Sequence, residues 1–188
     1  MKKIPSLFAR NYETDRLVRN EIVPGSRWVA AGEGVATRKF DGTCCRVQGG
    51  KLFKRYDAKQ GRVPPAGFIP AQDADPVTGH QPGWLEVGWG SDDQWYREAV
   101  TSGNPDKVDL PDGTYELCGP KVQGNPEGSA THVLVPHGKE ELPDCPRDFE
   151  GIKNYLAGRD VEGIVWHHPD GRMVKIKAKD FGIKRSRN

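Results

Sequence analysis

Glycine and proline interrupt this chain so often that few long helices can form. Among its 188 residues are 23 glycines and 15 prolines, and both residue types end helices and favour turns. Hydrophobic residues make up only 35% of the sequence, but the glycines bring the composition near that of ordinary globular proteins. A chain of this length is typically one domain. We therefore expect residues 1–188 to form a single α+β domain of mainly antiparallel sheets with a few helices.

Hydrophobic patterns and turn signals locate the expected elements. Strands are predicted at 28–31, on both sides of the Asp41-Gly42 turn within 35–47, and at 52–56, 114–117 and 133–135, the last two of them buried. A helix is predicted at 95–100, behind a capping box from Ser91 to Gln94, with a strand as the alternative for this segment. A second helix is predicted at 148–158, between the capping Asp148 and Gly158. Residues 61–83, rich in Pro, Gly, Asp and Gln, are predicted to form an ordered loop.

The clearest element is a hairpin near the end of the chain. Residues 163–166 and 173–178 read as two strands around Pro169-Asp170-Gly171. Because side chains alternate along a strand, Val174, Ile176 and Ala178 share one face. Lys175 and Lys177 share the other, so this strand places two ammonium groups close together.

The cysteines and histidines give little support for a metal site. Cys44, Cys45, Cys118 and Cys145 contain no C-x-x-C spacing, and none of the five histidines has a metal-binding spacing. Adjacent Cys44 and Cys45 would point to opposite faces of a strand, so they cannot easily bridge each other. We expect small buried thiols in a reducing compartment.

Charge and hydropathy exclude a membrane protein. No apolar run approaches the roughly 18 residues that a membrane span needs, and no apolar segment follows the basic start as in a signal peptide. We expect a cytoplasmic protein. The segment from Arg172 onward contains seven basic residues and one acidic residue, Asp180. This pattern suits a polyanionic partner, although a solvated terminus would show it too.

Four segments together suggest chemistry on a nucleotide. Lys39-Phe40-Asp41-Gly42 is followed along the chain by Glu116, by Glu162-Gly163 and by Lys175-Ile176-Lys177. A lysine attacks the α-phosphate of a nucleoside triphosphate only after it loses a proton, and neighbouring cations favour that loss. Two lysines can also neutralise charge that develops on the phosphate. The carboxylates are suitable ligands for Mg²⁺. Each segment alone is weak evidence, but their combination and order favour this interpretation.

With these motifs the chain resembles the covalent nucleotidyltransferase superfamily of ATP-dependent ligases and capping guanylyltransferases. Within it the sequence is most similar to the ATP-dependent 5′-to-3′ RNA ligases of the vertebrate RNA ligase 1 type. The likeness spans residues 35–183 and includes five further segments: Asp41-Gly42-Thr43-Cys44-Cys45, Gly79-His80-Gln81-Pro82-Gly83-Trp84, Gly124-Asn125-Pro126-Glu127-Gly128, Pro136-His137-Gly138 and Glu162-Gly163-Ile164-Val165-Trp166-His167. It implies a single ATP-grasp-like nucleotidyltransferase domain without an appended OB or RNA-binding domain.

The resemblance also implies roles for individual residues. The catalytic residues would be Lys39, the site of covalent AMP, with Glu162, Lys175 and Lys177. Nucleotide-binding residues would be Thr37, Arg38, Lys39, Arg55, Glu116, Glu162, Lys175 and Lys177. Mg²⁺ or Mn²⁺ would be held by Asp41, Glu116 and Glu162. RNA would contact Lys179, Lys184, Arg185 and Arg187.

Two positions depart from related families. DNA ligases and capping enzymes usually carry arginine where this chain has Cys44, which favours an RNA ligase. Several RNA ligases carry glutamate where this chain has Arg38, so the resemblance leaves open how adenine is recognised. The expected activity joins 5′-phosphate and 3′-hydroxyl RNA ends through lysyl-AMP and RNA-adenylate, as in RNA repair. The alternatives are a capping-type guanylyltransferase and a non-catalytic protein that binds RNA ends.

Overall fold

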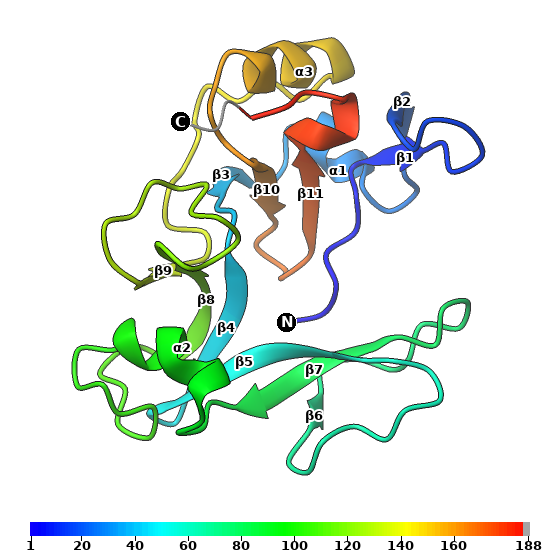
Figure 1. Ribbon diagram of the computed structural model, residues 1–188. Helices are drawn as coiled ribbons and strands as arrows, with labels where there is room; N and C mark the ends of the chain where they lie inside the picture. Colours follow the sequence, from blue (N-terminus) through cyan, green and yellow to red (C-terminus); the bar gives the residue numbers. More distant parts are fainter. Residues whose placement is uncertain (186–188) are drawn as a thin grey trace. The chain divides into compact units, whose positions relative to one another are not determined.

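The computed structural model describes residues 1–185 and has the predicted α+β class (Figure 1). Its named strands pair antiparallel throughout the described part of the chain. The chain folds into two compact units. The first unit contains Met1–Lys3 and Asp41–His137, and the second contains Ile4–Phe40 and the residues from Gly138 onward.

The first unit is built on a six-stranded sheet in the order β6-β7-β5-β4-β8-β9. The strands are β4 (Thr43–Gln48), β5 (Lys51–Ala58), β6 (Ile69–Pro70), β7 (Gln81–Glu86), β8 (Gly113–Cys118) and β9 (Val133–Pro136). One face of the sheet forms a core that includes Cys45, Leu52 and Leu117. The helical segments η1 (Ser91–Asp93) and α2 (Gln94–Glu98) lie between β7 and β8 in the chain, and Trp95 and Tyr96 pack against this core.

The second unit contains a three-stranded sheet in the order β11-β10-β3 and a separate β1-β2 pair. Its elements are β1 (Phe8–Arg10), β2 (Val18–Ile22), α1 (Arg27–Ala30), β3 (Val35–Lys39), α3 (Phe149–Ala157), β10 (Gly163–His167), β11 (Met173–Lys177) and η2 (Ala178–Phe181). In α3 the Asp148 carboxylate caps the helix by accepting a bond from the Gly151 amide at 2.8 Å. Ile152 and Leu156 of α3 join the core beneath the sheet with Ile164, Trp166 and Ile176.

Chain segments also run along both outer strands of the three-stranded sheet. Beside β11, the Leu7 amide donates to the Lys175 carbonyl at 2.8 Å, and the Lys175 amide donates to the Pro5 carbonyl at 2.9 Å. Beside β3, the Arg38 amide donates to the Glu140 carbonyl at 2.8 Å. The sheet is therefore hydrogen-bonded on both sides.

Several element predictions are correct and four are wrong. The helix predicted at 95–100 is present as α2, but neither α2 nor η1 has a side-chain cap, so the predicted capping box from Ser91 to Gln94 is wrong. The hairpin of β10 and β11 and the helix α3 are confirmed. Residues 28–31 are not a strand, because most of them form α1, whose Trp28 and Val29 enter the core. The predicted loop at 61–83 contains β6 and the start of β7. The predicted burial of 133–135 is also wrong, since β9 lies at the side of its sheet and stays partly exposed.

The strands on either side of Asp41-Gly42 exist, but they do not pair with each other. β3 belongs to the three-stranded sheet and β4 to the six-stranded sheet. The four cysteines are thiols outside any disulfide, and all but Cys44 are buried. Among the residues that the structure describes, no helix has the length and apolar character needed to cross a membrane.

Candidate active site

Three of the predicted lysines lie on one face of the three-stranded sheet. Lys39 of β3 and Lys177 of β11 both pair with Gly163 of the central strand β10. Two residues further along β10, Val165 pairs with Lys175. Because alternate residues share a face, Lys39, Lys175 and Lys177 project to the same side, opposite the buried Ile164 and Ile176.

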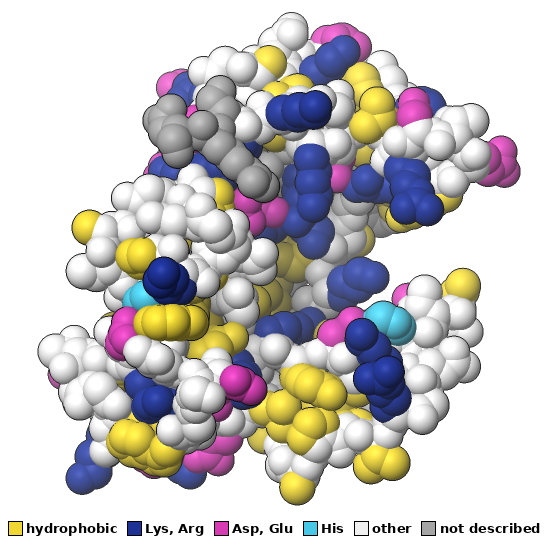
Figure 2. All heavy atoms as spheres, in the orientation of Figure 1, with side chains coloured by type: hydrophobic (Ala, Val, Ile, Leu, Met, Phe, Trp, Pro, Cys, Tyr) yellow, Lys and Arg dark blue, Asp and Glu magenta, His cyan; other side chains and the backbone are white. Residues whose placement is uncertain are grey.

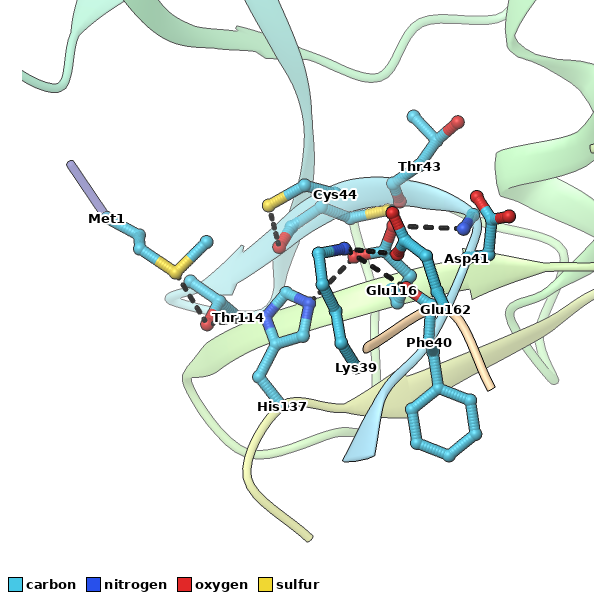
Figure 3. A network of polar contacts seen from close by, with 12 residues as sticks. Met1, Lys39, Phe40, Asp41, Thr43, Cys44, Thr114, Glu116, His137 and Glu162 are labelled. Carbon is cyan, nitrogen blue, oxygen red and sulfur yellow. Dashed lines mark hydrogen bonds and ion pairs between the residues drawn. The ribbon is translucent and has the colours of Figure 1, made fainter. Parts of the chain in front are cut away.

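Glu162 holds two of these lysines. One carboxylate oxygen, Oε2, lies 2.5 Å from Lys39 Nζ, and the other, Oε1, lies 2.5 Å from Lys177 Nζ. The Lys39 contact is visible in Figure 3, where the amino group points toward the carboxylate. The side chain of Glu162 is only 10% exposed. Two ammonium groups and one carboxylate therefore form a compact, largely desolvated cluster.

Burial and charge shift the pKa values of this cluster. Burial alone would raise the pKa of Glu162, but the charges and hydrogen bonds of Lys39 and Lys177 outweigh it, so the pKa is lowered. Lys175 lacks such a close carboxylate partner among the described ion pairs. Burial and the positive charges of Lys177 and Lys39 lower the pKa of Lys175 to about 8. The face therefore combines a stable carboxylate with a lysine that loses its proton easily.

Gly163 allows this arrangement because no larger residue fits its position. A Cβ on Gly163 would lie 2.1 Å from the Ile176 carbonyl oxygen and 2.8 Å from the Lys177 Cα. Lys39 and Lys177 thus flank a position without a side chain. The glycine of the Glu162-Gly163 motif has a packing reason that the sequence does not reveal.

Thr37 and Arg38, predicted to bind nucleotide, are engaged within the same unit. The buried Thr37 hydroxyl donates to the Val165 carbonyl at 3.1 Å and lies 3.0 Å from His167 Nε2. The Arg38 guanidinium lies 4.6 Å from the centre of the Phe40 ring and 3.4 Å from the Glu140 carboxylate. Their nucleotide contacts stay predictions.

The first unit holds the Asp41-Gly42 turn through two carboxylates. The Asp41 amide donates to Glu127 Oε1 at 3.0 Å, and the Gly42 amide donates to Glu116 Oε1 at 3.1 Å. A Cβ on Gly42 would lie 2.1 Å from the Leu117 carbonyl oxygen. β3 and β4 do not pair with each other because both edges of each strand have other partners: β3 lies between β10 and the segment at Glu140, and β4 lies between β5 and β8.

Glu116 is the centre of a second polar group in the first unit. Its Oε2 lies 2.8 Å from His137 Nε2, and the other ring nitrogen, Nδ1, lies 2.9 Å from Thr114 Oγ1 (Figure 3). Cys44 is the register partner of Glu116 across β4 and β8. Neither Cys44 nor His137 was predicted as a site residue. The sequence signal was their presence in segments of the family resemblance, since their wide separation forms no spacing motif.

Arg55, the last predicted nucleotide contact, is half-buried on β5. Its guanidinium lies 5.0 Å from the centre of the Trp84 ring and donates to the Met1 carbonyl at 2.6 Å. Burial lowers the pKa of Arg55. Asp41, Arg55 and Glu116 belong to the first unit, whereas Lys39, Glu162, Lys175 and Lys177 belong to the second. Whether Asp41, Glu116 and Glu162 hold one metal ion stays a prediction.

The predicted RNA contacts lie close after β11. Lys179 and Lys184 are exposed, whereas Arg185 pairs with Asp160, with 2.9 Å between Nε and the carboxylate. Arg187 lies outside the described residues. Lys and Arg side chains are numerous on the visible face of the unit that carries β10 and β11 (Figure 2). The RNA contacts of Lys179, Lys184, Arg185 and Arg187 stay predictions.

Comparison with known proteins places this chain among the RNA ligases. The family model "RNA ligase 1" matches residues 104–188. The RNA ligase 1 of Danio rerio is 30% identical over 220 aligned positions, covering 79% of this chain and 67% of the relative. The RNA ligase 1 of Mus musculus is 28% identical with the same coverage, and that of Rattus norvegicus is 29% identical. The chain belongs to the RNA ligase 1 family.

Proposed function

We propose that this protein is an ATP-dependent RNA ligase that joins 5′-phosphate and 3′-hydroxyl ends through lysyl-AMP and RNA-adenylate. The observation that carries the proposal is the cluster of Lys39, Lys175 and Lys177 around the single carboxylate of Glu162. Three lysines against one carboxylate leave an excess of positive charge, which suits a triphosphate. Family membership supports the RNA substrate.

The first chemical step would form a bond between Lys39 and the α-phosphorus of ATP. The neutral amine of Lys39 attacks the phosphorus, the bond to pyrophosphate breaks, and Lys39 Nζ loses a proton. Lys175 and Lys177 help in two ways, because their charges favour the neutral amine and balance charge on the phosphate oxygens. Glu162 orients Lys39 through the 2.5 Å contact. In the same scheme Thr37, Arg38, Arg55 and Glu116 contact the nucleotide.

Joining two RNA ends then requires two further transfers. The 5′-phosphate of RNA attacks the AMP phosphorus, and the bond to Lys39 breaks, which restores the amine and leaves RNA-adenylate. The 3′-hydroxyl next attacks the 5′-phosphorus and loses its proton to solvent, the bond between the 5′-phosphate and AMP breaks, and AMP leaves as the new phosphodiester forms. Throughout, water must be kept from the activated phosphates, and the largely buried Glu162 beside Lys39 supports limited solvent access there.

The predicted metal ligands have the chemistry that a divalent cation needs. Asp41, Glu116 and Glu162 offer carboxylate oxygens, which Mg²⁺ and Mn²⁺ prefer. When bound, Mg²⁺ or Mn²⁺ would supply charge neutralisation for the leaving pyrophosphate. Both oxygens of Glu162 already contact lysines, so an ion there would share the carboxylate with them.

Intact mass spectrometry tests the first step. Incubation with ATP and Mg²⁺ should add the mass of one AMP to the protein, with little adduct from GTP. Lys39→Arg keeps a cation beside Glu162 but removes the nucleophile, because arginine stays protonated, and it should form no adduct. Lys153→Arg, on the exposed side of α3, is the matched control and should form the adduct normally.

Two outcomes would support the alternatives instead. Preference for GTP would indicate a capping-type guanylyltransferase, and the absence of any adduct with either nucleotide would indicate a binding protein. A gel assay with 5′-phosphorylated RNA tests the later steps. Lys39→Arg should join pre-adenylylated RNA even though it cannot use ATP, because only the first two transfers need Lys39.

A further inference from the structure

Cys44, Glu116 and His137 bring three different metal-binding atoms together on one face of the six-stranded sheet. The Cys44 thiol, a Glu116 carboxylate oxygen and a His137 ring nitrogen all lie within 4.8 Å of one another. The sheet register creates this proximity, since Cys44 pairs directly with Glu116 and the His137 amide donates to the Thr114 carbonyl at 3.1 Å. The trio lies wholly within the first unit.

We propose that Cys44, Glu116 and His137 bind a Zn²⁺ ion. A thiolate, an imidazole and a carboxylate are the ligand types that Zn²⁺ takes in proteins, and three protein ligands leave a fourth position open. Mg²⁺ strongly prefers oxygen ligands and binds thiolate and imidazole poorly. The trio therefore selects a transition metal. Its ligand chemistry differs from that of the all-carboxylate magnesium site proposed above, although Glu116 belongs to both sets.

The hydrogen bonds around His137 already suit metal binding. A ligating histidine generally donates its second ring N–H to an oxygen, which fixes the ring. When Nε2 binds the ion, Nδ1 carries the hydrogen and can donate to Thr114 Oγ1, 2.9 Å away. The Thr114 hydroxyl can accept or donate, so the tautomer change leaves neither ring nitrogen without a partner.

Glu116 and Cys44 can also bind without losing the contacts that hold the turn. Oε1 of Glu116 accepts the Gly42 amide, whereas Oε2 is the oxygen beside His137. An ion at Oε2 therefore leaves the Asp41-Gly42 turn in place. Cys44 is partly exposed, unlike the other three cysteines. Cys45 on the opposite face is buried in the core, and burial raises the pKa of its thiol well above the usual range.

Binding of Zn²⁺ would inhibit nucleotide transfer, and this consequence rests on the proposed function. Glu116 is a predicted nucleotide contact, so a carboxylate engaged by Zn²⁺ is withdrawn from the nucleotide. We expect micromolar-range Zn²⁺ to slow AMP-adduct formation in the presence of Mg²⁺, and a chelator to restore it. Cys44→Ser should be less sensitive to Zn²⁺.

Direct metal titration tests the site without relying on enzyme activity. Co²⁺, which replaces Zn²⁺ and is coloured, should bind the full chain with one-to-one stoichiometry and give a thiolate-to-cobalt charge-transfer band. Zn²⁺ should displace it. Cys44→Ser should lose this band and bind Zn²⁺ about tenfold or more weakly, in the range found for altered metal sites. Cys45→Ala is the matched control from the same strand and should keep the band, with circular dichroism confirming its fold.

Two results would overturn the site: the absence of a charge-transfer band in the wild-type protein, or equal Zn²⁺ affinity of wild type and Cys44→Ser. If Cys45→Ala unfolds, Cys145→Ala serves as the control, because Cys145 lies in the other unit. The outcomes separate the two proposals. A normal cobalt spectrum without AMP-adduct formation would contradict the ligase mechanism alone, whereas adduct formation without the cobalt band would contradict the zinc site alone.

Discussion

Lys39 and Lys177 come from strands far apart in the sequence, yet they pair with the same residue, Gly163. With no side chain between them, the two ammonium groups reach the two oxygens of one carboxylate, that of Glu162. The arrangement depends on the backbone of the central strand as much as on the charged groups.

Gly163→Ala should destabilise the second unit. The added Cβ would lie 2.1 Å from a backbone oxygen of β11, which side-chain movement cannot relieve, so we expect a loss of about 2 kcal/mol or more. Gly158→Ala is the control, because its φ is −86° and its Cβ would have 3.8 Å of space. Urea unfolding measures both variants. A Gly163→Ala protein as stable as Gly158→Ala would contradict the close packing of β10 on β11.

Glu162→Gln should destabilise the protein by leaving two lysines without their shared counterion. Removing one partner of a buried ion pair costs about 3 kcal/mol or more. A double-mutant cycle isolates the interaction. Lys177→Met should cost clearly less in the Glu162→Gln background than in the wild type. The control Glu150→Gln, at an exposed position in the first turn of α3, should change the free energy of unfolding little. If the effects of Glu162→Gln and Lys177→Met are additive, the contact between the two residues does not stabilise the protein.

Lys175 should make the stability of the protein depend on pH in an alkaline window. Its pKa is about 8 in the folded protein and near 10.5 without the fold. Between these values the unfolded chain binds the extra proton, so stability should rise with pH, by about 1.4 kcal/mol for each unit of pKa difference. Below about pH 8 Lys175 is protonated in both states, so the full cost of holding its charge in the folded protein lowers the free energy of unfolding.

The measurement for Lys175 compares urea unfolding of wild type and Lys175→Met from pH 7 to pH 10. The stability of the wild type should increase relative to the variant above about pH 8, and the comparison cancels the titration of other groups. Lys153→Met, at an exposed position, should follow the wild type. A constant difference between wild type and Lys175→Met would contradict the lowered pKa of Lys175.

Lys179 and Lys184 should contribute to RNA affinity by neutralising phosphates. Replacing both with alanine should weaken binding of 5′-phosphorylated RNA and reduce the slope of log affinity against log salt by about 1 for each phosphate that is no longer neutralised. AMP-adduct formation should stay unchanged. The double variant Lys107→Ala/Lys153→Ala removes the same net charge elsewhere on the protein and serves as the control. Equal salt slopes for the two double variants would indicate a solvated terminus.

The sequence predicted the shared face of Lys175 and Lys177 in the second unit, but not the polar group around Glu116 in the first unit. The alternation of Lys175 and Lys177 with Val174 and Ile176 is a local pattern. It can be read from the sequence because the side chains of a strand alternate between its two faces wherever the strand lies in the fold. The pairing of Cys44 with Glu116 depends instead on strand register between segments about seventy residues apart, for which no local signal exists. The helix at Arg27–Ala30 was missed because four residues are too few to show a helical period.

The sheet that carries Lys39 and Lys175 has chain running along both of its outer strands, beside Lys175 at Pro5 and Leu7 and beside Arg38 at Glu140. Unpaired strand edges are sites of aggregation and of strand addition by other chains, and here both are covered. The backbone amides of Lys175 and Arg38 should therefore exchange slowly with deuterated solvent although their side chains carry charge. Truncation beyond Leu7 should release the amide of Lys175 first and leave this sheet prone to association with other copies.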